Sequence, residues 1–287
     1  MTQKLGARDA LLIAVICAAW AGNFLSSTLS LREFTPLLFT ALRLVLLAAI
    51  LGAFLKRPAK GQWPRLFAVA MCNGVVHFGL GFWSMSLSTT LASPAILMQA
   101  YVPIAALLAW LIKGERPSKI ASGAIAFSFA GVLVLGFDPS VLAHPMAAVL
   151  MLLSAFFLGL GTVLMRDLEG LDVFSQQGWT AVFGIVPLLA WSFAVEAHPI
   201  DVMKAASGWA WLGVAYAAIA SSLVGHGLYY VLVKRHPVAQ VTPYLLATPL
   251  LATILGIVFL NNAVGPRLWL GGSMVMGGVL AIAVSRE

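Results

Sequence analysis

Ten long apolar segments run through the 287 residues of this chain, and each is long enough to cross a lipid bilayer. A helix needs about 20 mostly apolar residues to span the hydrocarbon core. Inside lipid every backbone N–H and C=O must find a partner within the protein, and segments this long and uniform favour helices over barrel strands. The sequence therefore predicts an all-α integral membrane protein with helices at residues 10–30, 35–55, 66–86, 93–112, 120–137, 147–165, 174–195, 209–233, 239–260 and 268–285.

The composition leaves few polar side chains to cover a water-facing surface. The chain is 61% hydrophobic and 9% charged, whereas soluble domains carry roughly 25% charged residues. We therefore expect the lipid bilayer to be its main partner. The net charge of +7 does not indicate nucleic acid, because the basic residues flank the apolar segments.

The basic residues gather on one side of the membrane. Each even-numbered crossing returns the chain to the side of its N-terminus. Only Arg32, Lys204 and Arg267 fall on the other side, and Arg43 lies within a segment. The N-terminal side holds the remaining basic residues, which are Lys4, Arg8, Lys56, Arg57, Lys60, Arg65, Lys113, Arg116, Lys119, Arg166, Lys234, Arg235 and Arg286. Because cytoplasmic loops carry an excess of Lys and Arg, we predict a multi-pass protein of the bacterial inner membrane with both termini in the cytoplasm.

The two halves of the chain resemble each other. Residues 79–115 align without gaps onto residues 225–261, with a mid-segment proline at the same place in each. This predicts two five-helix repeats, 1–140 and 141–287, the second inverted because five crossings are an odd number. Inverted repeats around a central cavity are typical of alternating-access transporters. The alternative is that apolar helices resemble one another by chance.

Four short motifs connect the chain to a known family. They are Trp20-Ala21-Gly22-Asn23, Arg43, Gly114-Glu115-Arg116-Pro117 and Gly131-Val132. In their order and spacing the whole chain resembles the EamA-type members of the drug/metabolite transporter superfamily, and among these it is most similar to the YddG-type amino acid exporters. The second half departs from the pattern, with Asn261-Asn262 in place of Gly114-Glu115. The resemblance implies a cavity lined by the first, third, fourth, sixth, eighth and ninth helices, with the fifth and tenth at the periphery.

The acidic residues all lie in loops or at the ends of segments. Proton-coupled transporters usually place a carboxylate within the membrane, and this chain offers none; it also has no Walker loop for ATP. We therefore expect flux down a gradient, without ATP and without a cofactor or metal. The ten residues are Asp9, Glu33, Glu115, Asp138, Asp167, Glu169, Asp172, Glu196, Asp201 and Glu287.

Arg43 is the one charged residue well inside a segment. A guanidinium buried in a membrane is costly and is usually functional or paired. One interpretation is a fork for a substrate carboxylate. The other is that the side chain extends toward the interface or caps backbone carbonyls.

Two histidines and two proline-adjacent polar residues are further candidates for substrate binding. His77 and His226 lie within segments, and His77 is favoured because it precedes two glycines; a structural histidine is the alternative. Gln99 lies one turn before Pro103, where the proline frees a backbone carbonyl, and Thr242 precedes Pro249 comparably. A kink that serves packing alone would explain the same prolines.

Trp20 and Asn23 lie about one turn apart in the first segment. We predict that they line the cavity, with polar contact between helices as the alternative. Small residues crowd the fifth and tenth segments, where close helix packing explains them without a ligand.

The sequence favours a transporter that exports small metabolites, above all amino acids with broad selectivity, by alternating access. A mostly apolar cavity with scattered polar groups suits zwitterions with varied side chains. The alternatives are an exporter of drugs or other hydrophobic metabolites and, more distantly, a membrane-embedded enzyme. Because such an enzyme needs metal ligands or an acid–base pair at membrane depth, we expect no enzymatic activity. The oligomeric state stays open, and a monomer is compatible with the sequence.

Overall fold

The computed structural model describes residues 6–236 and 238–284, with the backbone alone at residues 238–240 and 242. In this part of the chain the secondary structure is helical, and ten helical spans are long and apolar enough to cross a membrane. The predicted all-α fold with ten membrane helices is confirmed. The spans are Ala7–Ser30, Pro36–Phe54, Trp63–Leu87, Ala92–Lys113, Lys119–Gly136, Pro145–Met165, Val173–Val195, Gly208–Val233, Pro243–Leu260 and Pro266–Val284.

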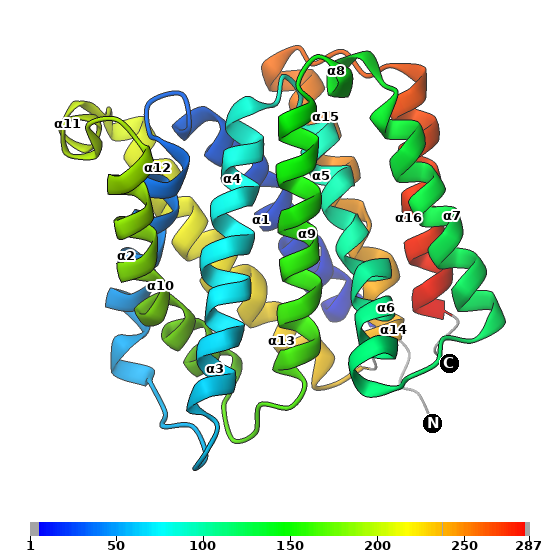
Figure 1. The fold of residues 1–287 in the computed structure, drawn as a ribbon, viewed down its shortest axis with the longest axis horizontal. Coiled ribbons are helices and arrows are strands. Elements are labelled where there is room, and N and C mark those ends of the chain that lie inside the picture. The colour runs from blue at the N-terminus through cyan, green and yellow to red at the C-terminus, as the bar shows by residue number, and fades with distance from the viewer. Residues whose placement is uncertain (1–5, 237, 285–287) are drawn as a thin grey trace.

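Several spans consist of more than one helical element, and two short helices lie between spans (Figure 1). The elements are α1 (Ala7–Ser30), α2 (Pro36–Leu51), η1 (Gly52–Phe54), α3 (Trp63–Val69), η2 (Ala70–His77), α4 (Phe78–Leu87), α5 (Ala92–Leu97), η3 (Met98–Ala100), α6 (Tyr101–Lys113), α7 (Lys119–Gly136), α8 (Pro139–Leu142), α9 (Pro145–Met165), α10 (Val173–Val195), α11 (Pro199–Ala205), α12 (Gly208–Tyr216), η4 (Ala217–His226), α13 (Gly227–Val233), α14 (Val238–Leu245), α15 (Ala247–Leu260) and α16 (Pro266–Val284).

The interruptions occur at matching places in the two halves. The third and eighth spans each contain a π-helix, η2 and η4, and each π-helix ends at a histidine. π-Helical turns are rare and are frequent at functional sites. The fourth span narrows to a 3-10 turn, η3, just before Pro103, and the ninth breaks at Leu246 just before Pro249. Each proline lacks the N–H that would continue the α-helix.

The departure from the family motif in the second half has a conformational explanation. Gly114 ends α6 with a φ of 72°, and Asn261 ends α15 with a φ of 54°. A positive φ is easy for glycine and is tolerated by asparagine better than by most residues. Asn261 therefore terminates its helix in the same way as Gly114 does.

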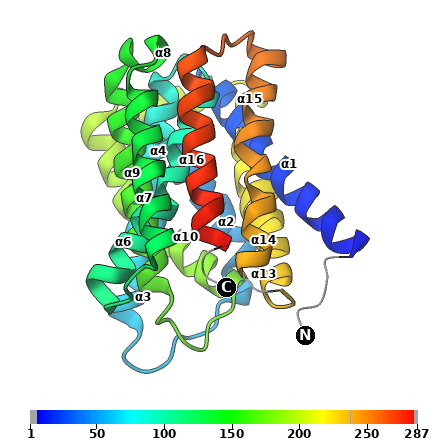
Figure 2. The same cartoon turned by 90° about the vertical axis from the view of Figure 1, so that its right-hand side faces the viewer.

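The spans form two groups of helices that each contain members of both halves. In the first helix group α1 packs against α12–η4–α13 and α14–α15, and in the second helix group α9 packs against α3–η2–α4 and α5–η3–α6. Between them α2 packs on α10, while α7 and α16 lie side by side at one edge of the bundle (Figure 1). The start of α1 is inclined away from the rest of the bundle (Figure 2).

Glycine permits the close contact between α7 and α16. A Cβ at Gly131 would lie 2.7 Å from the carbonyl oxygen of Gly271, and one at Gly278 would lie 2.7 Å from that of Ala124. Because backbone atoms cannot yield as a flexible side chain can, only glycine fits there. The small residues predicted to serve helix packing do so at these positions.

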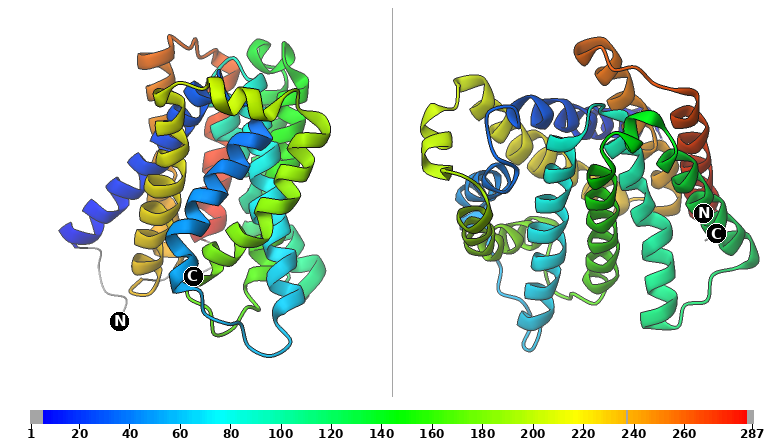
Figure 3. Two further views of the ribbon diagram at one scale, coloured as in Figure 1. Left: turned by 90° about the vertical axis from the view of Figure 1, so that its left-hand side faces the viewer. Right: turned by 45° about the horizontal axis from the view of Figure 1, so that its top comes forward.

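The bundle has two chemically different ends, which we name the basic end and the opposite end. The basic end contains the start of α1, the loops at 55–62, 114–118 and 166–172, and the end of α16; α8 and α11 lie at the opposite end (Figure 1; Figure 3). The largest apolar cluster lies mostly in the half toward the opposite end. It includes Phe24, Phe34, Phe39, Phe82, Met85, Leu91, Ile96, Met151, Val214, Ala252 and Leu268.

Ion pairs concentrate at the basic end. Asp167 pairs with Lys113 and Arg65, and Arg166 forms two hydrogen bonds of 2.9 Å with Glu115. The bonded Lys113 ammonium holds the pKa of the Asp167 carboxyl below its usual range. In the first helix group, Asp9 of α1 pairs with Arg235 at 3.8 Å and His236 at 3.1 Å.

Candidate functional site

The guanidinium of Arg43 joins α2 to the π-helix η4. Its side chain is 1% exposed. Nε donates to the carbonyl oxygen of Ala217 at 3.2 Å and to Oγ of Ser222 at 3.3 Å, and Nη2 donates to the same Oγ at 2.7 Å. The arginine therefore caps backbone, as one of its two interpretations predicted, but it does so on a helix of the other half of the chain.

Among the described residues, the groups that contact the guanidinium of Arg43 are neutral. Its Cζ lies 3.7 Å from the centre of the Phe78 ring and 5.7 Å from that of Phe82. Nη1 is buried without a hydrogen-bond partner. None of the ion pairs among the described residues includes this guanidinium. A cation held only by neutral acceptors and aromatic faces keeps its full charge inside the membrane.

His77 lies at the end of η2 and is tied to α9. Its Nδ1 lies 2.8 Å from Oγ of Ser154, and this hydroxyl donates to the carbonyl oxygen of His77 at 2.8 Å. Because the hydroxyl proton is used on the carbonyl, Nδ1–H donates to Oγ and Nε2 is the acceptor nitrogen. The two glycines after His77 contact different neighbours: a Cβ at Gly79 would meet Leu37, and one at Gly81 would meet Ser154.

Trp20 of α1 bonds to η4 at Ser221, the residue directly before Ser222, to which Arg43 bonds. Its Nε1 donates to the carbonyl oxygen of Ser221 at 3.2 Å, which also accepts from Nδ1 of His226 at 3.1 Å. The indole ring lies 5.2 Å from the His226 ring and 6.0 Å from the Tyr229 ring, centre to centre. A Cβ at Gly225 would lie 2.5 Å from Nε1 of Trp20, so this glycine leaves room for the indole.

The other residues predicted from the sequence lie close to these contacts along their helices. Asn23 is half-buried and accepts from Oγ of Ser27 at 3.3 Å, within α1 itself. Gln99 is 9% exposed and lies in the 3-10 turn η3. Thr242 lies in α14, and its side chain is outside the described residues.

The polar contacts around the two π-helices bring the halves of the chain together. Arg43 and Trp20 from the first half bond to η4, and Ser154 from the second half bonds to His77 in η2. The sequence reasoning did not select Ser154, Ser221, Ser222 or Tyr229. Only the adjacent pair Ser221-Ser222, one turn before His226, offered a signal in the sequence.

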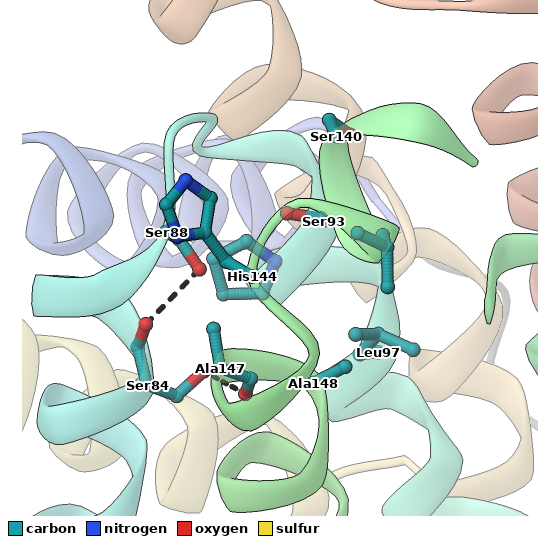
Figure 4. A pocket seen from close by; sticks show the side chains of 10 residues that line it. Ser84, Ser88, Ser93, Leu97, Ser140, His144, Ala147 and Ala148 are labelled. Atoms are coloured by element: carbon teal, nitrogen blue, oxygen red, sulfur yellow. Dashed lines mark hydrogen bonds between the residues drawn. The ribbon is translucent and has the colours of Figure 1, made fainter. Parts of the chain in front are cut away.

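A separate small pocket lies at the opposite end, between α4, α5, α8 and α9 (Figure 4). Its wall includes four serine side chains and His144, and Ser84 donates to the carbonyl oxygen of Ala147 at 2.6 Å. None of the site residues predicted from the sequence lines this pocket. The predicted central cavity is a different region, and it stays a prediction.

Comparison with known proteins gives the family context. A model of the EamA-like transporter family matches residues 8–137 and 145–284. The Escherichia coli strain K12 protein named probable amino-acid metabolite efflux pump is 23% identical over 280 residues, covering 95% of this chain and 93% of the relative. Its Salmonella typhimurium namesake is 24% identical over 281 residues, with the same shares covered.

Two further similarities extend over the whole chain. An uncharacterised Pseudomonas aeruginosa protein is 28% identical over 291 residues, covering 97% of this chain and 96% of the relative. A solved crystal structure superposes with a TM-score of 0.67 at 18% identity, covering 96% of this chain and 98% of that one. This last similarity concerns the fold alone.

Proposed function

Because the chain belongs to the EamA-like transporter family, we propose that it exports small metabolites, above all amino acids with broad selectivity, across the bacterial inner membrane. The ten apolar spans and the bacterial transporter relatives make it a multi-pass inner-membrane transporter. The names of the two efflux-pump relatives support the amino acid class. The proposed process is alternating access without ATP.

The observation that carries this proposal is the set of polar contacts at the two π-helices. Arg43, Trp20 and His77 each bond to the other half of the chain, at depths where helices in lipid otherwise meet through apolar or small residues. Polar groups at membrane depth mark substrate pathways. The aromatic faces of Trp20 and Tyr229 beside them suit apolar side chains of varied shape.

The proposed architecture is two inverted repeats, residues 1–140 and 141–287. It is supported by the paired π-helices η2 and η4, the paired proline breaks and the paired left-handed ends at Gly114 and Asn261. Inverted repeats give two equivalent ways to close one site, one toward each side of the membrane. We propose that His77, Gln99, Asn23, Trp20, Thr242 and Arg43 contribute to that site.

The proposed orientation places both termini in the cytoplasm. The basic end carries most Lys and Arg residues of the chain. Substrate then enters from the basic end and leaves at the opposite end, which is the direction of export.

Proteoliposomes that contain the purified protein test the function directly. We expect counterflow of several amino acids, with unchanged rates when the proton gradient is collapsed, because the acidic residues that the structure describes lie at helix ends or in loops. A panel of cationic dyes serves as the competing class. Flux of dyes without flux of amino acids would replace the proposal by drug export. If the protein transports neither class, the proposed function is wrong.

Variants of the same protein test the site. His77→Leu and Gln99→Leu each remove about one hydrogen bond, on the order of 1 kcal/mol or about a fivefold loss of apparent affinity. Met274→Leu on the peripheral helix α16 is the control and should leave affinity and substrate ranking unchanged. Unchanged affinity and substrate ranking in folded His77→Leu and Gln99→Leu would exclude both residues from the site.

A further inference from the structure

The charge of Arg43 is not explained by the contacts it makes. Its protein partners are a backbone carbonyl and a serine hydroxyl, both neutral acceptors. A neutral donor such as a glutamine amide could bond to the same acceptors without the cost of burying a charge. The protein nevertheless keeps a guanidinium at a site that is 1% exposed.

One end of this guanidinium has no partner at all. Nη1 carries two N–H groups, is buried, and has no hydrogen-bond acceptor. A planar guanidinium can bind a carboxylate through hydrogen bonds that also neutralise its charge. The unused N–H groups of Nη1 therefore have the charge and the donors to bind a carboxylate oxygen.

The surroundings of Arg43 add an apolar surface beside the charge. Arg43 and Trp20 bond to adjacent residues of η4, Ser222 and Ser221. Trp20 in turn lies against the rings of His226 and Tyr229, all three half-buried. A molecule with its carboxylate toward Arg43 would place its remaining atoms against these rings.

We infer that Arg43 sets the substrate class of this transporter by requiring a carboxylate, so that amino acids and other organic acids are accepted while amines and amides of the same shape are rejected. The inference rests on the proposed transport function and specifies its chemistry. Unpaired positive charge in a medium of low dielectric attracts an anion and repels a cation over several ångströms. The preference therefore extends to any substrate that lies against the rings of Trp20, His226 and Tyr229.

The test compares molecules that differ only in the carboxylate. Uptake of labelled phenylalanine or leucine into proteoliposomes is inhibited with the unlabelled amino acid, its amide, its amine, and the matching carboxylic acid without the amino group. For the unaltered protein we expect the carboxylic acid to compete within about tenfold of the amino acid, and the amide and amine to compete at least thirtyfold more weakly.

Variants then assign the preference to Arg43. In Arg43→Gln, checked for folding by its melting temperature, the ratio between amino acid and amide should fall to about threefold or less, while Arg43→Lys should keep a clear preference. Ser222→Ala removes the neutral partner but not the charge, and it should leave the ratio unchanged.

The outcomes separate the inference from the proposed function. If the unaltered protein transports amino acids but the amide competes as well as the acid, the inference is overturned and the transport function stands. This outcome does not depend on whether Arg43→Gln folds. A large ratio that persists in folded Arg43→Gln also overturns it. Absence of amino acid flux in the unaltered protein overturns both.

Discussion

At the opposite end of the bundle hydrogen bonds join the two helix groups. The ion pairs of the basic end lie within one group or, for Lys56 and Asp172, between the ends of α2 and α10. At the opposite end Oδ1 of Asn262 accepts from the N–H of Leu91 at 2.9 Å, and Nδ2 donates to the carbonyl oxygen of Thr89 at 3.2 Å. These contacts connect the loop after α15 with the start of α5. A Cβ at Gly256 would lie 3.1 Å from Cβ of Leu91, so the two groups also approach closely there.

The basic end has no equivalent contact among the residues whose side chains are described. Asp9, Arg235 and His236 belong to the first helix group, and Asp167 pairs with Lys113 and Arg65 of the second. The start of α1 diverges from the second group (Figure 2). The ends therefore differ in what connects the groups: direct hydrogen bonds do so at the opposite end, and the described side chains of the basic end show none between the two groups.

The largest effect on stability should come from truncating a buried aromatic side chain at the opposite end. Phe39 is fully buried, with its ring centre 4.9 Å from that of Phe82 and 6.4 Å from that of Phe34. Phe39→Ala should lower the free energy of unfolding by about 3 kcal/mol, because the cavity it leaves forfeits these contacts.

Phe54→Ala is the matched control at the basic end. Phe54 is 64% exposed, so its truncation should change the free energy of unfolding by less than about 0.5 kcal/mol. Unfolding in mixed detergent and denaturant gives both values. Equal effects of the two substitutions would contradict the assignment of the largest apolar cluster to the opposite end.

An intermediate effect is expected for the amide that bridges the helix groups. Asn262→Ala leaves the buried N–H of Leu91 without an acceptor and should cost about 1–2 kcal/mol of stability. Arg166→Ala removes a half-exposed ion pair at the basic end and should cost about 0–1 kcal/mol. Melting temperatures in one detergent compare them, and a larger loss for Arg166→Ala would reverse the comparison.

The smallest effect concerns the pH dependence of the basic end. The pKa of Asp167 is lowered by its bond to Lys113 and by the nearby Arg65 and Arg166. A lowered carboxyl pKa stabilises the folded state above the usual value of about 4, and this contribution is lost as the pH falls through the folded pKa. Asp167→Asn should therefore melt a little below the unaltered protein at pH 7.

The difference between Asp167→Asn and the unaltered protein should fade as the pH falls below about 4 and through the lowered pKa of Asp167. It should also shrink in molar salt, because exposed pairs are screened. Asn262 does not titrate, so the loss in Asn262→Ala should be similar at pH 5 and pH 7. A salt-dependent loss in Asn262→Ala would show that the opposite end is also held by charge.

The sequence alone was sufficient to predict the ten membrane helices. Hydropathy is a local property, and the bilayer leaves a chain no other way to satisfy its backbone, so each span could be read from its own residues. The prolines at Pro103 and Pro249 likewise act on their own helices, and the structure breaks both near the expected places. The position of the described acidic residues at helix ends and in loops was equally visible.

Only the tertiary structure decided how the polar residues pair. Arg43 could be recognised as a buried charge, but Ser222, its partner, lies 179 positions away, and Ser154 lies 77 positions from His77. The π-helices that carry these contacts have no signature in the hydropathy pattern. Hydrogen bonds between helices depend on how the helices are turned and stacked, and in lipid that is set by side-chain packing across the whole bundle and not by the residues of any one span.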